Sequence, residues 1–94
     1  MNKYESIVII KSGLEETAIK ALIQKFSDLI NNDGEVVSVE EIGLKRLAYE
    51  INKQKEGYYV IFKFAAKPTL IAELERVYRI ADEVLKFITI KNEE

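Results

Sequence analysis

The residues of this chain best suited to chemistry are two adjacent cations, Lys45 and Arg46, which lie between apolar residues shortly after Gly43. Leu47 and Tyr49 follow at alternate positions, the spacing that places side chains on one face of a β-strand. Such a strand would combine charges that bind phosphate with a packed apolar anchor. Cations on an edge strand also prevent aggregation. The sequence leaves both interpretations open.

Catalysis has little support in the residue types. The chain contains neither histidine nor cysteine, which excludes the commonest general base, disulfides, thiolate zinc sites and the usual nucleophile–histidine pairs. Three carboxylate pairs, at 15–16, 40–41 and 82–83, have no histidine or glycine-rich loop that would complete an acid–base or Mg²⁺ site. We therefore expect no enzymatic activity, no cofactor, no metal and no small-molecule substrate.

Length and composition indicate a single globular domain that covers residues 1–94. The hydrophobic share is 48% and the charged share is 32%, which is not a composition of disordered chains. No apolar run approaches the ~18 residues of a membrane span, and no signal-peptide pattern is present, so we expect a cytoplasmic protein. The 14 Lys and Arg residues against 16 Asp and Glu residues give a net charge of −2, whereas nucleic-acid-binding proteins are usually basic.

Four segments have the length and pattern of β-strands. The first is a continuous apolar run, typical of a strand covered on both sides. The second slips in its in/out alternation near Glu40 and again near Arg46, which predicts β-bulges. A polar turn at 52–57 leads to the third strand, which is aromatic. In chain order the expected strands cover residues 7–10, 35–47, 58–65 and 84–90.

Two segments have the period of amphipathic helices. Apolar residues recur at spacings of three and four from Leu14 to Ile30, and Gly34 supplies a glycine stop. The second helix opens at Pro68 and ends near Asp82. With right-handed crossovers, the order β-α-β-β-α-β predicts an α+β, ferredoxin-like split βαβ fold. Both helices would then cover one face of a four-stranded antiparallel sheet whose first and third strands are central.

Two helices can cover only one face of such a sheet, so the other face should be polar. The alternation along the strands instead places apolar side chains on this open face. We interpret them as a protein-docking face, and the alternative is ordinary β-propensity on a tolerant surface. The expected members of the face are Ile7, Ile9, Tyr59, Ile61, Ile88 and Ile90.

The stretch Glu41–Tyr49 resembles the family of bacterial small-ribosomal-subunit protein six, the ribosomal protein S-six family. Lys3-Tyr4-Glu5, Gly57-Tyr58 and the stretch 79–84 extend the resemblance over essentially the whole chain. The resemblance implies a structural ribosomal protein that binds the central domain of small-subunit ribosomal RNA together with ribosomal protein S-eighteen. Because that partner is small and basic, it would supply positive charge while this chain offers an apolar sheet face.

Carried over residue by residue, the resemblance also implies RNA contacts at positions of basic or aromatic type. Tyr4 and Tyr49 are either packing residues or rings that stack on an unpaired base. Two other classes of function remain open, a homo-oligomeric ligand-sensing domain and a general single-strand RNA binder. The expected RNA-binding residues are Lys3, Tyr4, Lys45, Arg46, Lys86 and Lys91.

Overall fold

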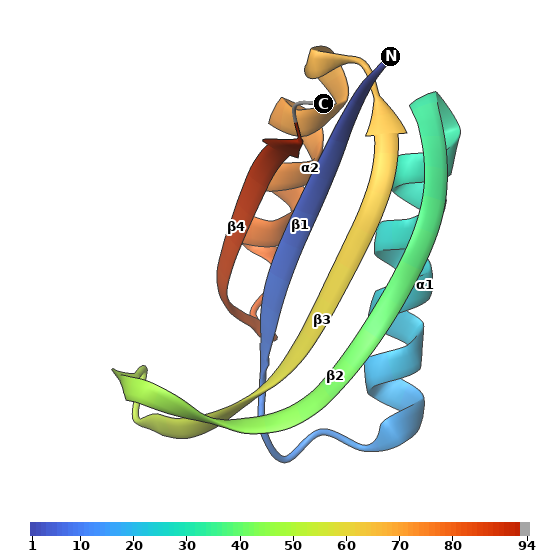
Figure 1. Cartoon of the computed structure of the whole chain (residues 1–94). Helices are drawn as coiled ribbons and strands as arrows, with labels where there is room; N and C mark the ends of the chain where they lie inside the picture. Colours follow the sequence, from blue (N-terminus) through green and yellow to red (C-terminus); the bar gives the residue numbers. More distant parts are fainter. Residues whose placement is uncertain (93–94) are drawn as a thin grey trace.

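A four-stranded antiparallel sheet carries two helices on one face and leaves the other face open (Figure 1). The computed structural model describes residues 1–92 of the chain. The strand order is β2-β3-β1-β4, so the first and third strands are central, as the sequence predicts. The elements are β1 (Asn2–Lys11), α1 (Glu16–Asp33), β2 (Gly34–Ile51), β3 (Gln54–Ala66), α2 (Pro68–Ile80) and β4 (Val84–Asn92).

The core lies between the sheet and the two helices, where alternate strand residues meet the apolar stripe of each helix. The ring of Phe26 on α1 packs edge-on against Phe62 of β3 and against Tyr78 of α2, with centroids 6.2 and 4.9 Å apart. All three rings are buried. This aromatic cluster fixes both helices on one side of the sheet and determines which strand residues remain on the other side.

β2 confirms the two predicted irregularities and adds a third. Its register against β3 shifts between Glu41 and Gly43 and again beyond Arg46, close to the positions where the alternation slips. Gly43 has a φ of +101°, in the left-handed region that favours glycine. A further shift between Val36 and Ser38 was not predicted.

The turn between β2 and β3 is shorter than the sequence suggests. It consists of Asn52 and Lys53, which have φ values of 47° and 65°, the signs of a type I′ hairpin turn. β3 therefore begins at Gln54, and Gly57 lies within the strand instead of ending a six-residue turn. The longer hairpin extends beyond the sheet and curls past β1 toward the β4 side (Figure 1).

Gly34 does not have the predicted role of a glycine stop at the end of α1. Its φ of −162° is ordinary extended backbone, so it is not a left-handed cap for α1. A Cβ at this position would instead clash with the backbone carbonyl oxygen of Ala65 on β3. Glycine at the start of β2 is thus required by close strand pairing, and α1 runs on to Asp33.

Candidate protein and nucleic-acid interface

The strand register brings the residues of the expected docking face together. The odd-numbered residues of β1 from Lys3 to Ile9 face away from the helices, and each has one neighbour on β3 and one on β4. The row through Ile7 is entirely isoleucine, and the rows on either side of it mix apolar and charged residues. The three rows, read from β3 through β1 to β4, are Lys63-Glu5-Ile90, Ile61-Ile7-Ile88 and Tyr59-Ile9-Lys86.

Exposure differs between the members of this face. Ile88 and Ile90 are each 47% exposed, and Ile7, Tyr59 and Ile61 are half-buried. Ile9 is only 9% exposed. The prediction that it belongs to the accessible surface of this face is therefore wrong. Ile9 is covered because the strand parity places it on the open face where the β2–β3 hairpin folds over.

The β2–β3 hairpin forms a wall at one end of the open face. Leu47 is buried and lies close enough to Gly57 that a Cβ there would be 3.3 Å from its Cδ2 atom. Further along, the Lys86 Nζ donates a hydrogen bond of 3.0 Å to the Tyr49 hydroxyl and lies 5.6 Å from the ring centroid. Leu47, Tyr49, Ile9, Tyr59 and Lys86 line a hollow of about 140 Å³, together with Ala48 and Ile51.

The contact between Tyr49 and Lys86 was not predicted. The two residues are 37 positions apart, and the sequence gives no sign that the hairpin curls back over the sheet. The only available signal was local, namely a tyrosine close to two cations at the end of β2. The path of the hairpin across β1 is a tertiary feature.

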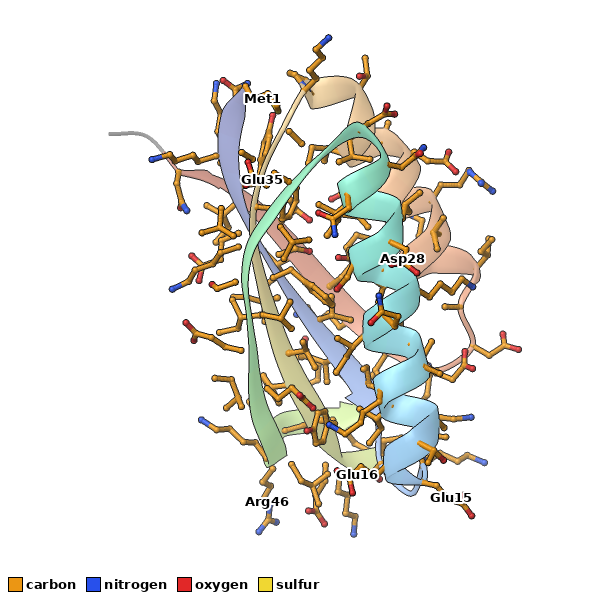
Figure 2. The ribbon with its side chains drawn as sticks, turned by 90° about the vertical axis from the view of Figure 1, so that its right-hand side faces the viewer. Met1, Glu15, Glu16, Asp28, Glu35 and Arg46 are labelled. Carbon is orange, nitrogen blue, oxygen red and sulfur yellow. The ribbon has the colours of Figure 1, made fainter. Side chains whose placement is uncertain are left out.

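The expected RNA-binding cations fall into two groups at opposite ends of the sheet. Lys3 and Lys91 lie at the end of the sheet where the chain begins, and their register partners, Asn92 and Tyr4, place them on opposite faces. Lys45, Arg46 and Lys86 lie toward the hairpin end. Figure 2 shows Arg46 at the end of the molecule opposite Met1.

Tyr4 does not have the exposure that an RNA contact requires. It is 8% exposed and stacks on Phe64 with ring centroids 5.7 Å apart, on the helix side of the sheet. Because successive strand residues point to opposite faces, Tyr4 points toward the helix layer and Lys3 toward the open face. The ring is a core residue and not a stacking platform for a base.

The charged residues of the chain are distributed unevenly between the helix layer and the sheet layer. The helices and adjoining segments, 12–33 and 67–83, carry five Lys or Arg residues and eight Asp or Glu residues. The strands and their hairpin, 2–11, 34–66 and 84–92, carry nine cations and six carboxylates. The sheet layer is therefore basic although the whole chain is slightly acidic.

The carboxylate pair at 40–41 takes part in surface contacts. Glu40 forms an ion pair of 3.1 Å with Lys63, and Glu41 accepts a hydrogen bond of 3.0 Å from the Tyr58 hydroxyl. Burial, that hydrogen bond and the negative charge of Glu41 raise the pKa of Tyr58 above its usual range.

Among residues 1–92, no three carboxylates gather in a way that could hold a metal ion. No helix in the described part of the chain is long and apolar enough to cross a membrane.

Comparison with known proteins gives a consistent result over the whole chain. The family model described as ribosomal protein S6 matches residues 3–91. The small ribosomal subunit protein bS6 of Clostridium novyi is 46% identical over 95 residues and aligns along all of both chains. The protein of the same name from Helicobacter hepaticus is 48% identical, over 99% of this chain and 69% of its own length.

A solved structure shows the same fold. The crystal structure of 30S ribosomal protein S6 from Thermotoga maritima superposes with a TM-score of 0.92 at 30% identity, over 97% of this chain and 87% of that one. The strand order, the helix layer and the full-length sequence match lead to one conclusion. This chain belongs to the ribosomal protein S6 family, whose members are structural, non-enzymatic components of the small ribosomal subunit in the bacterial cytoplasm.

Proposed function

We propose that this chain binds the central domain of small-subunit ribosomal RNA jointly with ribosomal protein S-eighteen. The observation that carries the proposal is the open sheet face. An all-isoleucine row crosses three strands there, and cations lie toward both ends of the same sheet. A protein partner and an RNA can therefore be held by adjoining parts of one surface.

The partner protein docks on the apolar rows. Ile61, Ile7 and Ile88 give a continuous apolar band, and Ile90 and Tyr59 extend it on either side. Covering several hundred Å² of such surface contributes roughly ten kcal/mol before the costs of association. The Glu40–Lys63 ion pair lies beside Ile61 in the register, and it forms part of the polar rim of this face.

The RNA binds through its phosphates. Lys3 and Lys91 at one end, and Lys45, Arg46 and Lys86 at the other, are the candidate contacts, and the buried Tyr4 is removed from that set. Contacts of this kind fix the position of a folded RNA without reading its bases. The acidic helix layer faces away from the RNA, so the net charge of −2 does not oppose this arrangement.

The test is a binding measurement on the central-domain RNA with and without ribosomal protein S-eighteen. We expect negligible binding of this chain alone and tight binding when the partner is present. Equal binding in both conditions would contradict joint recognition and favour an autonomous RNA binder. Sedimentation of the isolated chain separates the remaining alternative, because a ligand-sensing homo-oligomer requires a stable dimer in the absence of RNA and partner.

A further inference from the structure

We infer that Tyr49 is a stacking platform for one unpaired nucleobase of the bound RNA, with Arg46 and Lys55 beside it to hold the adjoining phosphates. This inference rests on the proposed function and adds a specific subsite to it. It assigns a role to the end of the hairpin, which lies outside the apolar rows on which the partner protein is proposed to dock.

The ring of Tyr49 is held in place but left accessible. It is 62% exposed, whereas Leu47, two residues earlier, is buried. Its hydroxyl accepts the hydrogen bond from Lys86, whose ammonium lies beyond the hydroxyl edge of the ring, 5.6 Å from its centroid. The exposure of Tyr49 leaves ring surface available to a base.

The surroundings of the ring match a nucleotide better than a protein side chain. On the hairpin, a hollow of about 220 Å³ is lined by Arg46, Tyr49, Glu50 and Lys55, with Leu47 and Ala48. The hairpin as a whole, residues 45–56, has four cations and two carboxylates. Sequence-tolerant binding of unpaired nucleotides combines an aromatic ring with such charges, whereas the centre of a protein interface is depleted of them.

Lys86 is a positioning residue in this arrangement. Its hydrogen bond restrains the tyrosine hydroxyl, and its charge lies close to the RNA that would cover the ring. Glu50 is the one carboxylate in the hollow, and it can accept a hydrogen bond from a base N–H. Tyr49 thus borders two hollows, one shared with Lys86 and the sheet and the other lined by Arg46, Glu50 and Lys55.

The experiment compares Tyr49→Leu, Tyr49→Phe and, as a matched control, Tyr58→Leu, each with folding confirmed. The readout is the affinity for central-domain RNA at saturating ribosomal protein S-eighteen. We expect Tyr49→Leu to bind about 5- to 100-fold more weakly, with an unchanged dependence on salt because the cations that neutralise phosphates all remain. Tyr49→Phe keeps the ring and should stay within about threefold of wild type, as should Tyr58→Leu, whose ring lies elsewhere.

Two results would overturn the inference. One is binding by Tyr49→Leu within twofold of wild type. The other is a loss of affinity of Tyr49→Leu for ribosomal protein S-eighteen without RNA that equals its loss of affinity for RNA, since the ring would then be part of the protein interface. A nuclear magnetic resonance titration with hexa-adenylate separates this inference from the proposed function. Upfield shifts of the Tyr49 ring protons would support stacking even if joint binding to ribosomal RNA failed, and no shift there would contradict stacking.

Discussion

The hydroxyl oxygens of Ser6 on β1 and Tyr78 on α2 lie 3.0 Å apart inside the core. The Ser6 Oγ is also 3.2 Å from the Oγ1 of Thr89, its register partner on β4. Ser6 is fully buried, and no buried side-chain polar atom in residues 1–92 lacks a hydrogen-bond partner. One small polar side chain thus connects the second helix to a central strand and to an edge strand.

We expect Ser6→Ala to lower the free energy of unfolding by about 1–3 kcal/mol, because the buried Tyr78 hydroxyl loses its hydrogen-bond partner. Tyr78→Phe should cost less, about 0.5–1.5 kcal/mol, since Ser6 keeps its bond to Thr89. Urea denaturation of both variants measures the difference. Equal or larger destabilisation by Tyr78→Phe would show that the hydroxyl of Ser6 is satisfied mainly through Tyr78.

Stability should fall at alkaline pH because of the same tyrosine. Burial raises the pKa of Tyr78 well above its usual value near 10. Above pH ~10 the folded state therefore keeps a proton that the unfolded state has lost. The stability that Tyr78 contributes is complete below pH ~10 and declines above it. The free energy of unfolding should drop by up to about 1.4 kcal/mol per pH unit in that range. In Tyr78→Phe, measured in parallel, this part of the slope should be absent, and identical slopes would refute the assignment.

Gly57 permits the close approach of the hairpin to β1. A Cβ at this position would clash with the Cγ2 of Ile9 and lie 3.3 Å from the Cδ2 of Leu47. Gly57→Ala should therefore destabilise the protein by about 1–3 kcal/mol, as overpacking does. Adding Ile9→Ala removes the clashing methyl group, so thermal or urea unfolding of the double variant should show less than the sum of the two single effects. Strict additivity would mean that the hairpin moves away from Ile9 freely.

Ile61→Asp should abolish binding to ribosomal protein S-eighteen while the isolated chain still folds. The substitution places a charge at the β3 end of the isoleucine row, where the partner would bury it. Ile80→Asp is the matched control, because Ile80 is 63% exposed on the helix layer, away from the open face. Calorimetric titration of both variants with the partner decides the matter, and affinity of Ile61→Asp within twofold of wild type would exclude this face.

Arg46→Ala should weaken assembly on central-domain RNA and lower the salt dependence of binding by ~0.7–0.9 for each phosphate that Arg46 neutralises in the wild type. Arg76→Ala removes an arginine from the helix layer, where it pairs with Glu73 at 2.6 Å, and it should leave the slope unchanged. Affinities measured over a range of salt concentrations give both slopes. An unaltered slope for Arg46→Ala would remove this residue from the RNA surface.

The element order could be predicted because its signals are local. The apolar stripe of α1, the proline that opens α2 and the apolar runs of the central strands each depend on residues close together in the chain. Strand ends were less predictable. The charged residues Lys55 and Glu56 have the composition of a turn. They instead belong to a strand that extends beyond the sheet, where both side chains are exposed to solvent.

The candidate site could be predicted only in part. Strand parity was sufficient to place Ile7, Ile61 and Ile88 on one face, since alternation fixes the side to which each residue points. The same parity, followed along β1, excludes Tyr4 from the surface of Lys3. The burial of Ile9 could not be inferred, because it depends on where the hairpin lies and not on the strand itself.

The sequence by itself determined the split βαβ fold, the apolar open face and the family resemblance, because short-range periodicity and a full-length pattern carry that information. Only the tertiary structure decided that the hairpin curls over Ile9, that Tyr49 meets Lys86, and that the basic charge gathers in the sheet layer. These features depend on contacts between residues far apart in the chain. Their energies come from packing between distant segments, which leaves no periodic trace in the order of the amino acids.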